Sequence, residues 1–269
     1  MKRFLLAFDG KNYSPGVVRM AMMLHQLEPA YLTAAFIPKL DYDRLWSFSS
    51  AEGSIPLVGG EEDEVVKKHI ENFEASCKQY QVKYQVRNDY LGFAVPELKR
   101  ETRFSDLLLL GGESFFSGKG NDLNDYVKET LHQSECPAMV VPEEFYFPRS
   151  IILAYDGTGS SVFAIKQFAY LFPEMCSYPA ILVYSEEAEE NIPDKEDIQL
   201  LAQLHFPNLK MLKLDADPSN DFKDWINERR RSLLVTGAFG RSTFAQMFRK
   251  SFIEDILQES RLPVFISHL

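Results

Sequence analysis

A glycine-containing stretch near the end of the chain has residue types that bind anions. Gly237 and Gly240 follow an apolar run, and Lys250 and Ser251 come after nine further residues. Glycines let backbone N–H groups approach a phosphate closely, and a hydroxyl at a helix start adds a donor near the positive end of the helix dipole. Residues 237–252 have a net charge of +3, from Arg241, Arg249 and Lys250 with no acidic residue. The stretch therefore predicts a phosphate-binding loop.

The chain contains an internal duplication. The segment KRFLLAFDGKNYS at 2–14 is repeated as RSIILAYDGTGSS at 149–161, and DYVKETLHQSECPAMVV at 125–141 is echoed by SFIEDILQESRLPVFIS at 251–267. The front parts align at an offset of 147 residues and the back parts at an offset of 126. The first copy therefore has about 21 extra residues, which we place around 40–64. These form a cover over the first copy, a surface for a partner, or an ordinary long loop.

Each copy alternates short apolar runs with amphipathic stretches. Arg3–Phe8 is an apolar run ended by Asp9 and Gly10, which is typical of a buried parallel strand. Ser14 and Pro15 are suited to cap and begin the helix that follows. The alternation predicts an α/β fold of two tandem doubly wound domains, each with a five-stranded parallel sheet and helices on both faces. We place the domains at 1–146 and 147–269.

The order of these parts, present twice, resembles the universal stress protein family, and the whole chain resembles its tandem two-domain members. Some members of that family bind adenine nucleotides through the motif G-x2-G-x9-G-[S/T]. The second copy matches that motif at Gly237, Gly240 and Ser251, and Lys250 replaces its third glycine. Lys250 either places a cation beside a phosphate or blocks the close backbone approach that glycine allows. Gly237, Gly240 and Ser251 can also be explained without a ligand. The two glycines would permit a tight turn, and Ser251 would cap a helix.

The resemblance also implies where the adenosine part of a nucleotide binds. In the family an acidic residue after the first strand holds the adenosine, and the ends of the second and fourth strands border the base. The matching positions in the second copy are Asp156, Val183, Tyr184 and Thr236. Asp9 is the counterpart of Asp156, and because both precede glycine, a role in a turn explains either one equally.

The first copy has lost most of the nucleotide motif. Of the matching positions, only Gly111 keeps its glycine; the others are Ser114, Asn124 and Asp125. Residues 111–126 have one basic and three acidic side chains, a net charge of −2, and carboxylates repel a phosphate. We therefore expect no nucleotide in the first copy.

Composition excludes several other functions. The formal charge of −10 disfavours a general nucleic-acid binder, and the apolar run at the N-terminus is too short for a signal peptide or membrane span. The three cysteines lie far apart, which favours a reducing cytoplasm over a disulfide framework or a metal site. No catalytic motif is recognisable, so the sequence leaves enzymatic activity uncertain and favours its absence.

The sequence thus favours a cytoplasmic tandem universal stress protein, a regulatory module whose second domain binds ATP or another adenine nucleotide. The alternatives are a nucleotide-free scaffold for a protein or small ligand and a weak ATP hydrolase. In the family, domains commonly pair through their last strands, here Ala138–Val141 and Val264–Ser267, which implies such pairing within the chain. Pairing would cover two exposed sheet edges. A homodimer of such chains is a further expectation.

Overall fold

The computed structural model describes residues 1–9, 12–37, 61–88, 94–112, 125–184, 191–214, 225–226, 228–237 and 261–267. The first half of the chain contains β1 (Lys2–Asp9), α1 (Pro15–Leu27), β2 (Ala30–Ile37), α3 (Glu61–Tyr80), β3 (Lys83–Arg87), α4 (Ala94–Thr102), β4 (Leu107–Gly111), α5 (Asp125–Gln133) and β5 (Ala138–Val141). The second half contains β6 (Ser150–Tyr155), α6 (Gly159–Leu171), the short 3-10 helix η1 (Pro173–Ser177), β7 (Ala180–Tyr184), α7 (Lys195–His205), β8 (Leu209–Lys213), β9 (Ser232–Gly237) and β10 (Val264–Ser267). Most of the predicted 40–64 insertion lies outside the described residues.

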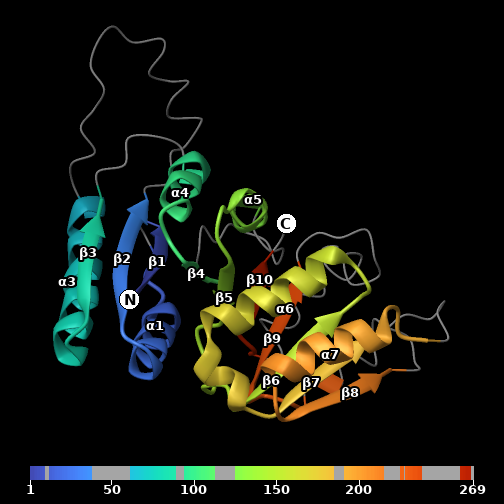
Figure 1. Cartoon of the computed structure of the whole chain (residues 1–269). Helices are drawn as coiled ribbons and strands as arrows, with labels where there is room; N and C mark the ends of the chain where they lie inside the picture. Colours follow the sequence, from blue (N-terminus) through green and yellow to red (C-terminus); the bar gives the residue numbers. More distant parts are fainter. Residues whose placement is uncertain are drawn as a thin grey trace, which may run out of the picture.

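All ten strands form a single sheet in the order β3-β2-β1-β4-β5-β10-β9-β6-β7-β8 (Figure 1). The strands are parallel within each half, and β5 pairs with β10 in the antiparallel direction. The expected pairing of the last strands is therefore present, with Met139 opposite Phe265. The two five-stranded sheets that the sequence predicts are joined into one, because this pairing satisfies both edges.

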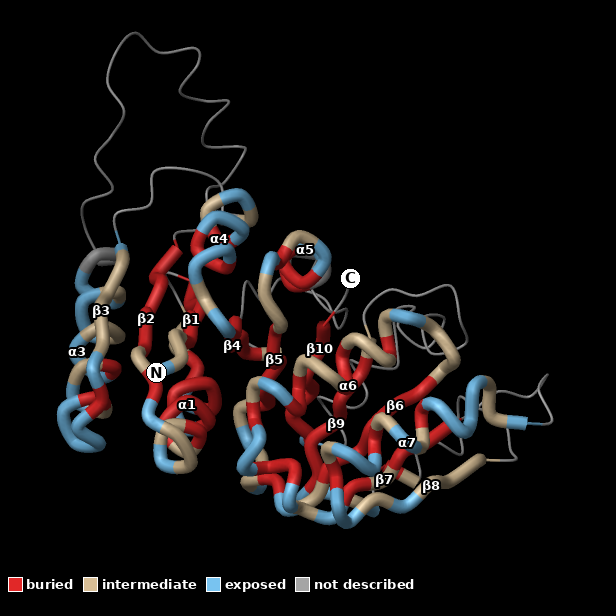
Figure 2. The backbone as a smooth tube through the Cα atoms, in the orientation of Figure 1, coloured by how far each residue is buried: buried red, intermediate tan, exposed pale blue. Residues whose placement is uncertain are grey.

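The core lies on both faces of this sheet. Alternate residues of β1 point to opposite faces, so that Phe4, Leu6 and Phe8 belong to one buried cluster and Leu5 and Ala7 to the other. Helices α1, α3, α6 and α7 contribute to the first cluster, and α4 and α5 contribute to the second. Both clusters contain residues of both halves, and the buried strands are seen between partly exposed helices in Figure 2. The predicted doubly wound architecture is confirmed.

The helices that follow β1 and β6 begin differently, although the sequence repeat aligns Ser14 with Ser161. Ser14 caps α1 as expected, since its side chain accepts the N–H of Val17 at 3.2 Å. In the second half the cap is Thr158, which accepts the N–H of Ser161 at 3.3 Å, and Ser161 lies inside α6. Helix α6 therefore starts closer to its strand than α1 does.

Within the described part of the chain, no helix combines the length and the apolar character that crossing a bilayer requires.

Candidate functional site

The carboxyl ends of β6, β7 and β9 bring several predicted site residues to the same edge of the sheet. Asp156 follows β6, Tyr184 ends β7, and Gly237 ends β9. Strand β6 lies between β7, which follows it in the chain, and β9, which the chain reaches by crossing back from β8. This is the topological switch point, where open α/β sheets form their binding crevice. The structure thus brings the described half of the predicted site together.

Asp156 is held in a local turn at the start of α6. Its Oδ1 accepts two hydrogen bonds from Thr158, one from the backbone N–H at 3.0 Å and one from the hydroxyl at 2.6 Å. The backbone N–H of Asp156 also lies 3.5 Å from the hydroxyl of Ser161. These contacts fix the carboxylate at the edge of the sheet. They show that Asp156 forms a side-chain turn with Thr158, as the structural interpretation of this residue predicts.

Gly237 is in close contact with the first turn of α6. A Cβ at this position would lie 2.6 Å from the carbonyl carbon of Ser160 and 2.6 Å from the nitrogen of Ser161. Side chains do not tolerate such distances to backbone atoms, so the close packing of β9 on α6 requires glycine here. Gly237 therefore has a structural reason that is independent of any bound phosphate.

Val183, Tyr184 and Thr236 are all buried, at 0%, 1% and 3% exposure. Val183 and Tyr184 are consecutive strand residues, and they belong to the core clusters on opposite faces of the sheet. The hydroxyl of Thr236 donates to the carbonyl oxygen of Gly237 at 3.2 Å. These three side chains therefore expose little surface at this edge of the sheet.

The phosphate side of the predicted site, Gly240, Lys250 and Ser251, lies outside the described residues. Its role as an anion-binding loop stays a prediction. The basic residues Arg241 and Arg249 lie in the same undescribed segment.

Side chains of the first half contact one another after the end of β1. Both carboxylate oxygens of Asp9 accept hydrogen bonds from Asn12, from its backbone N–H and from its side-chain amide. The ring of Tyr13 stacks on Phe8, with centroids 5.2 Å apart, and on His69, with centroids 5.5 Å apart. The acidic group that resembles the adenosine contact is thus engaged locally in the first half.

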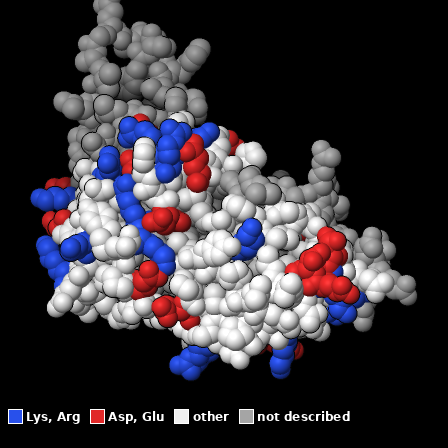
Figure 3. Space-filling model, in the orientation of Figure 1, with Lys and Arg blue, Asp and Glu red and all other residues white. Residues whose placement is uncertain are grey.

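Several carboxylates lie near the end of β6 and the start of α7. Figure 3 shows acidic side chains gathered where α7 begins, and the first turn of α7 contains Glu196 and Asp197. Burial raises the pKa of the Tyr155 hydroxyl, and the carboxylates of Asp194, Asp156 and Asp197 raise it further.

Two residues of this edge were not among the predicted site residues. Thr158 binds Asp156, and Tyr155 donates its hydroxyl to the carbonyl oxygen of Pro193 at 3.0 Å. The contact between Thr158 and Asp156 could have been predicted, because an aspartate often forms a side-chain turn with the residue two positions on. No local pattern indicates the second contact, since it joins residues 38 positions apart.

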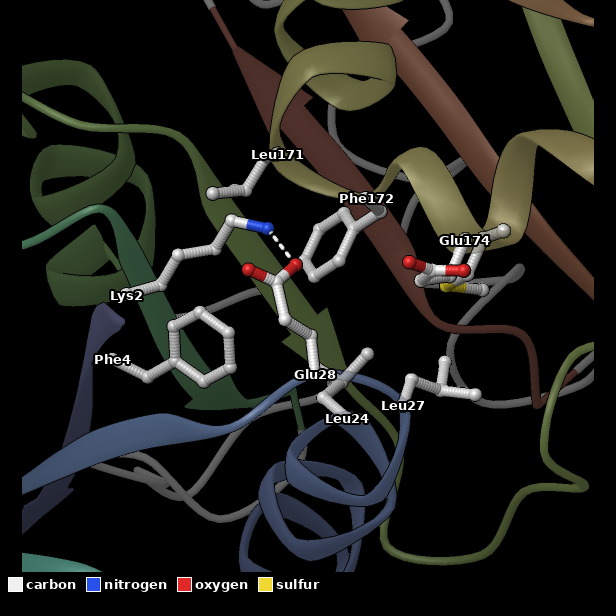
Figure 4. Close-up of a pocket in the computed structure, with 9 residues that line it drawn as sticks. Lys2, Phe4, Leu24, Leu27, Glu28, Leu171, Phe172 and Glu174 are labelled. Carbon is white, nitrogen blue, oxygen red and sulfur yellow. Dashed lines mark hydrogen bonds and ion pairs between the residues drawn. The ribbon is translucent and has the colours of Figure 1, made fainter.

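A separate small pocket lies where the two halves meet (Figure 4). Its apolar wall comes from the ends of α1 and α6, including Leu24, Leu27 and Leu171. The ammonium group of Lys2 forms an ion pair with Glu28 across this pocket. None of the predicted site residues that the structure describes lines it, so it is distinct from the edge that carries Asp156.

Comparisons with known proteins give a consistent result for the fold. No family model matches this sequence, and a search of curated proteins gives no match. Among solved structures, a universal stress protein from Archaeoglobus fulgidus is similar with a TM-score of 0.71 and 13% identity, over 99% of this chain and 96% of that one. A Pseudomonas aeruginosa protein proposed to be a universal stress protein has a TM-score of 0.56 and 9% identity, over 100% and 93% of the two chains.

Another Pseudomonas aeruginosa protein, of unknown function, is similar to the same degree, with a TM-score of 0.56 and 9% identity over 100% of this chain and 92% of that one. At these low identities the similarity concerns the fold. The chain has the fold of the universal stress proteins over its whole length.

Proposed function

We propose that this protein is a cytoplasmic tandem universal stress protein, with domains at 1–146 and 147–269, whose second domain binds ATP or another adenine nucleotide. The observation that supports this most is the placement of Asp156 and Gly237 on neighbouring strands at the switch point. In the proposed complex Asp156 contacts the adenosine, and Gly237, Gly240, Lys250 and Ser251 surround the phosphates.

The first domain acts as a structural partner in this proposal. Asp9 is bound by Asn12, and Tyr13 packs over the same edge. In addition, a carboxylate oxygen of Glu143 accepts the N–H of Gly16 at 3.1 Å, so the start of α1 already has an internal anion. These contacts support a single nucleotide site per chain.

Calorimetric titration of the full chain with ATP tests this proposal. Wild-type protein is expected to bind close to one equivalent, and Asp156→Asn and Gly240→Val are expected to weaken binding at least tenfold. Asp9→Asn is the matched control, because it makes the same change at the equivalent position of the first domain and should leave the affinity unchanged. Absence of saturable binding at millimolar ATP would contradict the proposal.

One observation favours a second function, a nucleotide-free scaffold. Gly237 is required by its contact with α6, so this match to the motif does not by itself indicate a ligand. A scaffold would show no adenine-nucleotide binding in the same titration, and mass spectrometry of the purified, denatured protein would find no retained nucleotide.

A further inference from the structure

The last side chain of β6 is fastened to the segment that precedes α7. Tyr155 is 1% exposed, and its hydroxyl donates to the backbone carbonyl of Pro193 at 3.0 Å. The Tyr155 side chain is buried and Pro193 is partly buried, so the hydroxyl depends on this carbonyl as its hydrogen-bond partner. This bond joins the end of β6 to the segment between β7 and α7.

Pro193 also lies against the turn that carries Asp156. Gly157 has a positive φ of 77°, and a Cβ added to it would lie 3.1 Å from two carbons of the Pro193 ring. Gly157 separates Asp156 from Thr158, whose N–H and hydroxyl hold the Asp156 carboxylate. The Tyr155–Pro193 bond therefore keeps the proline in contact with the turn that positions this carboxylate.

The start of α7 has no side-chain cap from the residue that precedes it. Asp194, which precedes the helix, has a left-handed φ of 45°, and its side chain makes no capping hydrogen bond. A helix start without such a cap leaves its first N–H groups dependent on other partners. The bond from Tyr155 to Pro193 attaches this segment to the end of β6, and Ile192 packs against the core beside it.

The two copies differ at this position. The first copy has Phe8 in AFDG where the second has Tyr155 in AYDG, and both rings are 1% exposed. The hydroxyl is therefore present only in the copy that keeps most of the nucleotide motif. Phe8 also shows that a phenyl ring fits at the end of such a strand.

From these contacts we propose that Tyr155 is a positioning residue for the second-domain ligand: it anchors Pro193 over Gly157 and so sets the Asp156 carboxylate in its binding position. This inference rests on the proposed nucleotide-binding function.

Tyr155→Phe tests the proposal, since it removes one hydroxyl and keeps the ring. In ligand-free protein, hydrogen exchange followed by NMR should become about tenfold faster at the amide of Thr158, which bonds to Asp156, and at the amide of Ile198, which bonds to Asp194. The affinity for ATP should fall about five- to tenfold.

Tyr178→Phe is the matched control. Tyr178 is partly buried in the same half, and its hydroxyl makes no hydrogen bond within the described part of the chain. Both exchange rates and the affinity should equal those of the wild type in this variant. The amide of Val17, which bonds to Ser14 in the first half, should be unchanged in both variants.

The outcomes separate the two proposals. If Tyr155→Phe leaves exchange at Thr158 and Ile198 unchanged, the anchoring is overturned. If exchange accelerates while ATP affinity stays at the wild-type value, the positioning role is overturned and nucleotide binding stands. If the wild type binds no ATP, the proposed function fails and the positioning role fails with it.

Discussion

Met139 of β5 and Phe265 of β10 lie opposite each other where the two halves of the sheet meet, and both are 0% exposed. Their strands run antiparallel, whereas the strands within each half are parallel. Phe265 packs edge-on against Phe168 of α6, with centroids 5.3 Å apart. The junction is therefore a continuous part of the core, and each half stabilises the other.

Phe265→Ala is expected to lower the free energy of unfolding by about 3–5 kcal/mol, because it leaves a cavity in a cluster that both halves share. Chemical denaturation followed by circular dichroism measures this change. Phe104→Ala removes a ring that is 63% exposed and should cost less than about 0.5 kcal/mol. A loss below 1 kcal/mol for Phe265→Ala would show that the junction is loosely packed.

Gly237→Ala is expected to destabilise the ligand-free protein by about 1–3 kcal/mol, since its Cβ would overlap the backbone of Ser160 and Ser161. Thermal unfolding without nucleotide gives the measurement. Gly159→Ala is the control, because Gly159 is exposed in the first turn of α6, where alanine favours the helix. Equal stability of Gly237→Ala and wild type would mean that this glycine serves a ligand alone.

Glu143→Ala is expected to cost about 1 kcal/mol, because the carboxylate accepts the N–H of Gly16 at the positive end of α1. Hydrogen exchange at the Gly16 amide should accelerate at the same time. Glu144→Ala is the neighbouring control: it removes a largely exposed carboxylate that pairs with Arg261 and should leave the Gly16 amide unaffected. Unchanged exchange at Gly16 in Glu143→Ala would argue against this helix contact.

The pKa of His69 is lowered because burial outweighs the opposing effect of Asp9, and Lys68 lowers it further. The folded protein therefore takes up a proton at His69 less readily than the unfolded chain. Stability should fall as the pH drops below the unfolded value of about 6.5, and it should stop falling below the depressed folded pKa. His69→Gln should flatten this dependence in denaturation series between about pH 7 and pH 5.5. Parallel curves for both proteins would rule out a contribution from His69.

The sequence by itself determined the positions of most strands, because buried parallel strands are short apolar runs bounded by turn residues. Ala138–Val141 and Val264–Ser267 begin and end at the residues expected from the sequence. The duplication also indicated that these strands form two similar sets, and the resemblance to the universal stress proteins implied that the last strands of the two sets pair.

Only the tertiary structure decided how the candidate site is held. The contact of Gly237 with Ser160 and Ser161 joins residues more than 70 positions apart, and the bond from Tyr155 reaches Pro193. Such contacts depend on how a helix and a strand pack together, to within fractions of an ångström, and a local pattern of residue types does not contain that information. The sequence predicted which edge of the sheet carries the candidate site, and the packing of the neighbouring elements decided which side chains hold that edge in place.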